Sequence, residues 1–381
     1  MTAVSPIRLE TVLNVEDGNT SEQVSSFVTN SAGKKMEDII IDDEILPKRQ
    51  NTIAEGLHPL LASMKLSGLY FNRQSADASD NPQQKFRRCN AYVIYAAAIV
   101  TLLCINVVRM LTVFTQDDKF GPFLFSKLIL VIWTIQCAIS QTAFYAACFS
   151  GRLAAVFSQL LDDSCARHAR KFATIYAVVA WSVIMSCTAF FVYGLFFSDG
   201  LNDTIIAPLQ IHVIISSPTI PRIIASVILF YLMSAYIFSQ AMTFVLAMIF
   251  SHQFKKVINT LGCCLDNEQR QVSDLDIETF RQQHQEIAMT VSHVDDCLMF
   301  SNASAFCCQV SCFIILLYNL TFYQSFITDP VLIISNVLWM FLLSFGLTLT
   351  AGGGIMVHHY VSLFNVVAIL LGVSSCTKIR S

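Results

Sequence analysis

The residues of this sequence that could bind a metal lie in a polar stretch at about residues 251–296. His293 and Cys297 are four positions apart, so a helix would place both on one face. Cys263 and Cys264 belong to the same part of the chain. Zinc sites are typically built from motifs such as paired Cys-x-x-Cys, and that spacing is absent here. We therefore predict that the chain has neither a metal site nor a metal cofactor.

The carboxyl-terminal part holds two further patterns of polar or flexible residues. His358 and His359 are adjacent, and neighbouring side chains on a helix point about 100° apart, so they cannot hold one ligand. Gly352-Gly353-Gly354 lacks the Lys-Ser/Thr pair of a phosphate-binding loop, and we interpret it as a hinge or break after a helix. No Ser/His/Asp set, paired-carboxylate site or nucleotide motif is recognisable. We predict that the chain is not an enzyme and uses no cofactor.

The composition is that of a membrane protein. Of the 381 residues, 54% are hydrophobic and 13% are charged, whereas a soluble domain carries about 25% charged residues. The net charge of −3 gives no basis for binding nucleic acid. Seven cysteines lie inside apolar runs, where they serve as small apolar residues: Cys104, Cys137, Cys148, Cys187, Cys307, Cys308 and Cys312. We predict an all-α, polytopic transmembrane helix bundle.

The positions of the apolar runs predict six or seven membrane spans, because each run approaches or passes the roughly 20 residues that cross a bilayer. The predicted spans are about 91–114, 124–149, 172–197, 220–250, 297–324 and 331–350, with a weaker seventh at 355–373. Four glutamines inside these runs are predicted to hydrogen-bond between helices: Gln136, Gln141, Gln240 and Gln309.

The remaining segments flank this bundle, which occupies residues 85–373. Residues 1–56 are polar and acid-rich, and are predicted to form a disordered tail. Residues 57–84 are predicted to form an amphipathic helix and a linker, and residues 374–381 a short tail. The helix carries its apolar residues at i, i+3, i+4 and i+7, namely Leu57, Leu60, Leu61 and Met64. The polar stretch 251–296 is predicted to be a helical extension outside the membrane.

The distribution of Lys and Arg predicts the orientation of the chain. Lys and Arg gather at the predicted flanks near residues 85–88, 152–171 and 255–281, and this side should be cytoplasmic. The amino terminus and the polar extension would then lie in the cytoplasm. The sequon Asn202-Asp-Thr204 would lie outside, and Asn202 is the predicted glycosylation site.

Two segments resemble the insect gustatory and odorant receptor superfamily and its gustatory receptor-like relatives. The first is Leu57-His-Pro-Leu-Leu followed by Lys65-Leu-Ser-Gly-Leu, which resembles the segment before the first helix of the family. The second is His284-Gln-Glu-Ile287 followed by Val294-Asp295 and Leu298, which resembles the long cytosolic helix of the family that runs into its fifth span. By this resemblance, the residues expected on the subunit-packing helix are His284, Gln285, Ile287, Val294 and Leu298.

The carboxyl end departs from that family. The last helix of the family carries Thr-Tyr, a hydrophobic run and Gln-Phe, and lines the ion pore, but this motif is absent here. Either the run at 355–373 replaces that helix in diverged form, or the chain stops before it, as a splice form would. The resemblance therefore covers about residues 57–350.

The resemblance implies a gustatory-type chemosensory receptor in the plasma membrane, a homo- or hetero-tetrameric cation channel opened by a small molecule. The alternative is a relative without chemosensory channel activity, with a light-sensing, oxidant-sensing or developmental role, or a truncated isoform that does not conduct. A ligand pocket would lie in the outer half of the bundle and be lined by aromatic and polar groups. The candidates at that depth, each of which could instead serve packing, are Tyr193, Tyr231, Tyr318, Asn336 and Trp339.

Overall fold

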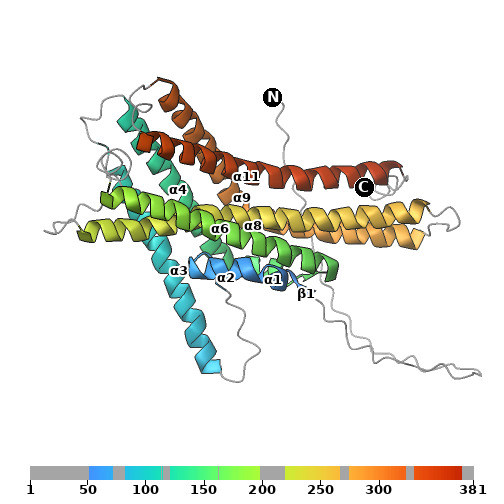
Figure 1. Cartoon of the computed structure of the whole chain (residues 1–381). Coiled ribbons are helices and arrows are strands. Elements are labelled where there is room, and N and C mark those ends of the chain that lie inside the picture. The colour runs from blue at the N-terminus through green and yellow to red at the C-terminus, as the bar shows by residue number, and fades with distance from the viewer. Residues whose placement is uncertain are drawn as a thin grey trace, which may run out of the picture. The chain divides into compact units, whose positions relative to one another are not determined.

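The computed structural model describes residues 51–71, 82–112, 114, 121–161, 163–197, 219–266, 274–322 and 330–370 of the chain. All of these residues belong to one compact unit, Arg49–Ser381. Six long helices make up most of it (Figure 1). Their bounds are α3 Pro82–Leu111, α4 Pro122–Phe149, α6 Asp163–Phe197, α8 Thr219–Asp266, α9 Asp274–Phe322 and α11 Pro330–Leu370.

Each of these six helices is long and apolar enough to cross a membrane. The predicted all-α transmembrane bundle is therefore confirmed. The helices are not equally central. In α8, 67% of the most apolar segment is buried, whereas in α3 the share is 22%. Because α8 packs on α4, α6, α9 and α11, it forms the centre of the bundle, and α3 lies at its periphery.

A short amino-terminal clip precedes the bundle. It consists of strand β1 (Asn51–Thr52), α1 (Ile53–Gly56) and α2 (His58–Leu66). The side chains of Thr52 and Glu55 form a capping box at the start of α1, and β1 pairs antiparallel with β2 (Leu160–Leu161). Residues 51–56, which the sequence predicted as part of a tail, therefore form regular structure, and residues 1–50 lie outside the described residues.

The amphipathic stripe predicted for residues 57–64 faces the bundle. Leu57, Leu60 and Met64 are fully buried, and Leu61 is 5% exposed. Both α1 and α2 pack against α6. The four positions follow the helical period, so the apolar contact with α6 is what holds this short segment in place.

Two helices extend far beyond the thickness of a bilayer. Helix α8 has 48 residues and α9 has 49, which correspond to roughly 72 Å at 1.5 Å per residue, against a hydrocarbon core of about 30 Å. The surplus lies at their shared polar end, where α8 and α9 run side by side (Figure 1). We call residues 251–266 of α8 and 274–296 of α9 the polar extension.

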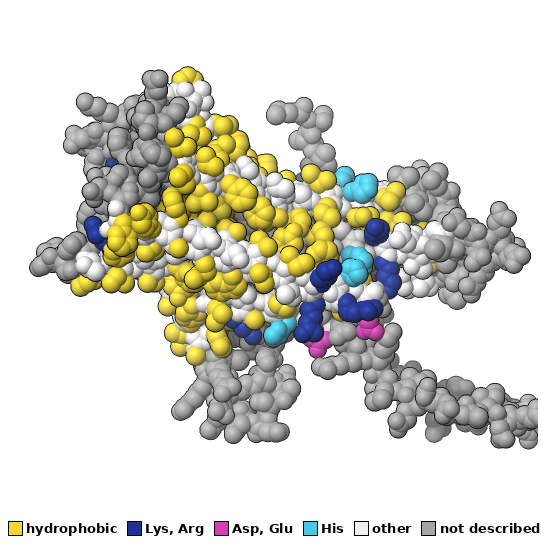
Figure 2. Space-filling model, in the orientation of Figure 1, with side chains coloured by type: hydrophobic (Ala, Val, Ile, Leu, Met, Phe, Trp, Pro, Cys, Tyr) yellow, Lys and Arg dark blue, Asp and Glu magenta, His cyan; other side chains and the backbone are white. Residues whose placement is uncertain are grey.

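The surface of the bundle reflects this division. Figure 2 shows hydrophobic side chains over most of the visible face, with Lys, Arg and His gathered toward one end. Exposed apolar residues such as Val178 and Met185 on α6 lie on the helix part that faces lipid. The charged end is where a membrane boundary belongs.

The prediction of a hinge at Gly352-Gly353-Gly354 is wrong. Helix α11 continues without a break from Pro330 to Leu370, so the run at 331–350 and the described part of the run at 355–373 form one helix. Gly353 is buried, and a Cβ atom there would lie 3.1 Å from the Cβ of Ala247 on α8. Gly353 thus allows the close approach of α11 and α8, and the three glycines form no turn. The described part of the chain holds six candidate spans, and the seven-span version is not observed.

Candidate functional site

A cluster of aromatic and polar side chains fills the centre of the bundle. Trp133 of α4 meets Trp339 of α11 edge to face, with ring centroids 5.1 Å apart, and it meets Tyr236 of α8 at 6.5 Å. Phe191 of α6 packs on Trp339 at 5.8 Å. These side chains are at least 96% buried, so they join four helices in one packed contact.

Tyr236 also carries the polar side of this cluster. Its hydroxyl donates to the carbonyl oxygen of Leu342 at 3.0 Å and accepts from the Nε2 of Gln309 at 3.3 Å. Thr350 donates to the Oε1 of Gln240 at 3.4 Å. These bonds connect α8, α9 and α11. These bonds agree with the prediction that Gln240 and Gln309 form hydrogen bonds between helices.

Glycine at position 346 makes this cluster possible. A Cβ atom at Gly346 would lie 2.5 Å from the Tyr236 hydroxyl oxygen, 2.7 Å from the Gln309 Nε2 and 2.9 Å from the Gln240 Oε1. Any side chain would displace all three groups. The three polar side chains therefore pack directly on the backbone of α11.

Several buried polar atoms near the bundle centre lack a hydrogen-bond partner among the described residues. They are Gln136 Nε2 and Oε1, Gln240 Nε2, Gln309 Oε1, Ser335 Oγ and Asn336 Nδ2. An unpaired amide group in a membrane interior costs free energy, so this arrangement is poorly satisfied and can exchange partners. The other predicted glutamine, Gln141, instead donates to the carbonyl of Gly68 at 2.8 Å and ties the clip to α4.

A separate hollow of about 500 Å³ lies between the end of α6 and the start of α8. These helix ends flank residues 198–218, the segment predicted to lie outside the membrane. The lining is apolar and aromatic with two hydroxyls, and consists of Val192, Phe196, Ile223, Ser226, Val227, Phe230 and Tyr231. Its size falls in the range of roughly 300–1,000 Å³ typical of small-molecule sites.

Tyr231 links this hollow to the rest of the chain. Its hydroxyl shares a hydrogen bond of 3.1 Å with that of Tyr95 on α3, and Tyr95 donates to the carbonyl of Leu66 at 2.6 Å. Beside it, Phe230 stacks on Trp181, whose ring contacts Phe238 deeper in α8. A molecule in the hollow would therefore touch side chains that lead both to the clip and to the bundle centre.

The five predicted ligand-binding residues do not share one pocket. Trp339 and Asn336 are buried on α11 in the bundle centre, and Tyr231 lines the α6/α8 hollow. Tyr193 is 59% exposed and stacks on Phe197, and Tyr318 is 37% exposed and packs on Phe125 and Phe322. Of the five, Tyr231 lines the α6/α8 hollow, which is large enough for a ligand.

Sequence reasoning did not propose Tyr95, Tyr236 or Phe230 for any site. One signal was present for Tyr236, because it precedes Gln240 by four positions and so shares a helix face with a polar residue inside a span. Tyr95 gives no such signal, since its partners Leu66 and Tyr231 lie 29 and 136 residues away.

The residues predicted on the subunit-packing helix lie along the amino-terminal half of α9. Leu298 is fully buried, and Ile287 and Val294 are half-buried against the core of the same chain. His284 packs on Phe254 of α8 with centroids 5.3 Å apart, whereas Gln285 is exposed. Four of the five thus pack α9 against its own bundle, and Gln285 does not.

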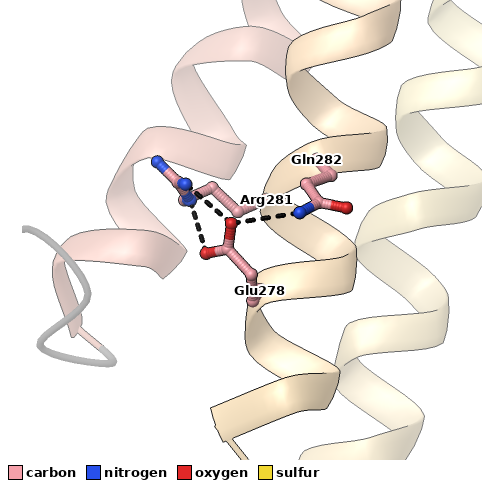
Figure 3. A network of polar contacts seen from close by, with 3 residues as sticks. All are labelled: Glu278, Arg281 and Gln282. Atoms are coloured by element: carbon pink, nitrogen blue, oxygen red, sulfur yellow. Dashed lines mark hydrogen bonds and ion pairs between the residues drawn. The ribbon is translucent and has the colours of Figure 1, made fainter. Parts of the chain in front are cut away.

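The outer face of the polar extension carries a small ionic network. Arg281 forms a bidentate pair with Glu278, with both N–O distances at 2.7 Å, and Gln282 donates to Glu278 at 3.3 Å (Figure 3). The two charged side chains are 52% and 42% exposed. Exposed ion pairs one helical turn apart contribute little to stability. The network shows instead that this face of the polar extension is polar and exposed.

The residues that the sequence offered as possible metal ligands do not form a metal site in the described part of the chain. His293 is exposed and Cys297 half-buried on α9, and the side chains of Cys263 and Cys264 fall outside the described residues. Over the described ranges, no three His, Cys, Asp or Glu side chains gather as metal ligands would. His358 and His359 are both exposed on α11. The predicted glycosylation site, Asn202, lies outside the described residues.

Comparison with solved structures identifies a protein of similar fold. No protein-family model matches the sequence, and no curated protein matches it. The fold is similar to the structure of the insect olfactory receptor OR5 from Machilis hrabei, with a TM-score of 0.59 over 80% of this chain and 80% of that chain, at 15% sequence identity. At this identity the likeness establishes the fold, and the chain therefore has the helical architecture of an insect olfactory receptor.

Proposed function

We propose that this chain is a subunit of a ligand-gated cation channel of the insect chemoreceptor kind, and specifically a gustatory-type receptor. The observation that carries this proposal is the shared fold with an insect olfactory receptor over 80% of both chains. The sequence adds the two segments at Leu57 and His284 that resemble gustatory receptors. In this proposal the protein acts in the plasma membrane as a homo- or hetero-tetramer, with its amino terminus in the cytoplasm.

The ligand in this proposal is a small molecule held in the α6/α8 hollow. The lining offers aromatic rings and the hydroxyls of Tyr231 and Ser226, which suits an apolar molecule that carries one hydrogen-bonding group. Sugars fit this lining poorly, because each buried hydroxyl of a sugar would need its own partner. Aromatic alcohols and bitter-tasting aromatic compounds are the preferred class.

The proposed route from ligand to channel runs through α8. A ligand that hydrogen-bonds Tyr231 competes with Tyr95, and so loosens the connection between α8 and α3. The ring contacts from Phe230 through Trp181 to Phe238 lead into the bundle centre. There the imperfectly paired amides of Gln240 and Gln309 allow α8, α9 and α11 to shift against one another.

The experiment is a current measurement in cells that express the chain, with benzyl alcohol, caffeine and sucrose as probes. We expect benzyl alcohol or caffeine to evoke a cation current and sucrose to evoke none. Tyr231→Trp, which fills the hollow, should abolish the current. Tyr193→Trp is the matched control, since Tyr193 is an exposed tyrosine on α6 outside the hollow.

The outcomes at equal surface expression separate the alternatives. A current that Tyr231→Trp leaves unchanged would contradict the ligand site. A chain that reaches the surface and stays silent with every probe, alone and with a co-expressed receptor subunit, would favour the relative without channel activity.

A further inference from the structure

A groove of about 660 Å³ lies on the side of the bundle, on helices other than those that line the α6/α8 hollow. Helices α3 and α9 both pack on α4, and the groove lies between them over α4. Neither the bundle centre nor the proposed ligand site uses it.

The groove has an apolar floor and apolar walls. Small side chains of α4 make up the floor, including Ala138, Ala143, Ala146 and Ala147. Val107 and Cys104 of α3 form one wall, and Phe300 of α9, which is 69% exposed, forms the other. Exposed apolar walls in the membrane part of a helix bundle face lipid rather than water.

The polar groups of the groove gather at one end. Ser150 closes α4, Gly151 turns the chain with a φ of 73°, and Arg152 opens α5 (Arg152–Phe157). Asp296 lies on the other side of this end, where the polar extension of α9 passes into its apolar run. Arg152 and Asp296 are both exposed, and neither side chain forms a hydrogen bond or ion pair with another described residue.

The groove is longer than one half of a bilayer is thick. From Ser150 to Ile135 the floor rises 15 residues along α4, or roughly 22 Å, and one leaflet of hydrocarbon is about 15 Å thick. Measured from its charged end, the groove is about 7 Å longer than one leaflet, so it can hold the full length of an acyl chain anchored by its headgroup.

We propose that the groove between α3, α4 and α9 is a binding site for a glycerophospholipid with a zwitterionic ethanolamine headgroup. One acyl chain lies along the alanine floor, the phosphate pairs with the guanidinium of Arg152, and the ammonium group pairs with the carboxylate of Asp296. The opposite charges of Arg152 and Asp296, both at the mouth of this apolar groove, complement the phosphate and the ammonium of this headgroup in kind. A purely anionic lipid would leave Asp296 unpaired and repelled.

The test uses the full chain in lipid nanodiscs with phosphatidylethanolamine that carries a photoactivatable diazirine in one acyl chain. Labelled peptides are mapped by mass spectrometry. We expect labels on residues 135–147 of α4 and near Phe300 of α9. Thr142→Trp, which adds an indole to the groove from an exposed position, should reduce this labelling about tenfold, whereas Val178→Trp on the exposed face of α6 should not.

Headgroup selectivity is tested by competition with unlabelled lipids. Arg152→Gln should weaken competition by phosphatidylethanolamine and by phosphatidylglycerol about tenfold, because both carry the phosphate. Asp296→Asn should weaken only phosphatidylethanolamine, because phosphatidylglycerol has no ammonium group. If Thr142→Trp fails to give a monodisperse protein, Ala146→Trp serves in its place, since Ala146 is also exposed in the groove.

Three results would overturn the proposal. Equal competition by phosphatidylethanolamine, phosphatidylglycerol and diacylglycerol would show an ordinary annular lipid. Labelling that the tryptophan variants leave unchanged would place the lipid elsewhere. Cross-links from groove residues to a second chain would show that another subunit covers this face. None of these readouts depends on channel activity.

Discussion

At the scale of single residues, the buried cluster around Tyr236 depends on close contact with the backbone of α11. Gly346→Ala should destabilise the protein by about 1–3 kcal/mol, because the added methyl group overlaps with three polar side chains at 2.5–2.9 Å. Gly354→Ala on the same helix is the control, since nothing lies within 4 Å of its Cβ position. Thermal unfolding of the two variants in detergent should separate them, and equal stability would contradict the observed packing.

The Tyr236 hydroxyl itself should contribute measurably to the free energy of unfolding. Tyr236→Phe removes the donor to Leu342 and the acceptor for Gln309 while keeping the ring contact with Trp133. Hydrogen bonds between membrane helices contribute about 0.6–1.7 kcal/mol, and we expect a loss of this size in chemical unfolding. Tyr176→Phe on α6 is a matched control for loss of a tyrosine hydroxyl, as it is half-buried against Phe244. A loss no larger than in the control would refute this role of the hydroxyl.

A histidine pair in the polar part of the chain predicts a dependence on pH. His252 stacks on His168 of α6 with ring centroids 4.6 Å apart. Burial lowers the pKa of His252 below its ordinary value of 6.5, and the nearby charges of His168, Lys255 and Lys256 lower it further. Because the folded chain disfavours the protonated ring, stability that is fully present above about pH 6.5 is reduced as the pH falls below that value.

The corresponding measurement is the thermal midpoint of the purified protein at about pH 7.5 and about pH 5. The decrease should be smaller in His252→Gln than in the unchanged protein. His293→Gln, which replaces an exposed histidine of α9, should behave like the unchanged protein. The same decrease in all three proteins would rule out the histidine pair as its cause.

At the scale of elements, the stability of the amino-terminal clip should depend on the N-cap of α1. Thr52→Ala removes the hydrogen bond from the backbone N–H of Glu55 to the threonine hydroxyl, which caps α1. An N-cap of this kind contributes about 1 kcal/mol, so amide hydrogen exchange at residues 53–66 should become roughly fivefold faster. Ser158→Ala, at the end of α5, should leave these amides unchanged. Unchanged exchange in Thr52→Ala would show that the capping box does not hold the clip.

The long helices could be predicted from the sequence, whereas the short strand pair and the role of the triple glycine could not. Apolar runs of membrane length are a local signal, so the six spans and the stripe at Leu57 to Met64 could be read directly. The pairing of Asn51–Thr52 with Leu160–Leu161 could not, because two residues at a separation of more than 100 positions leave no periodic pattern. The triple glycine was misread, since glycine suits a close contact between membrane helices as well as it suits a turn.

The candidate site was less predictable than the fold, because it depends on which helix faces meet. Tyr231 was proposed from its type and depth, and it does line a hollow. Tyr193 and Tyr318 satisfied the same criteria, yet they lie on exposed faces. Depth in the membrane can be read from the position in an apolar run, whereas direction requires knowledge of the neighbouring helices.

At the scale of the whole molecule, the proposed orientation places Asn202 outside the cell. We expect the expressed protein to carry one N-linked glycan, detected as a shift in gel mobility after digestion with an endoglycosidase. Asn202→Gln should remove that shift. Asn302→Gln is the control. Its sequon, Asn302-Ala-Ser304, lies within α9 at membrane depth, where it should not be glycosylated. Glycosylation that persists in Asn202→Gln would argue against this topology.

The central claim is that the six-helix chain lies in the membrane with the orientation of an insect chemoreceptor channel, and the position of the amino terminus tests it most directly. An epitope tag placed before Met1 is stained in cells with and without permeabilisation, and a second tag in the segment near Asn202 reports the outer side. The account predicts staining of the amino-terminal tag only after permeabilisation, and staining of the second tag in intact cells. An amino-terminal tag that antibodies reach in intact cells would contradict the account.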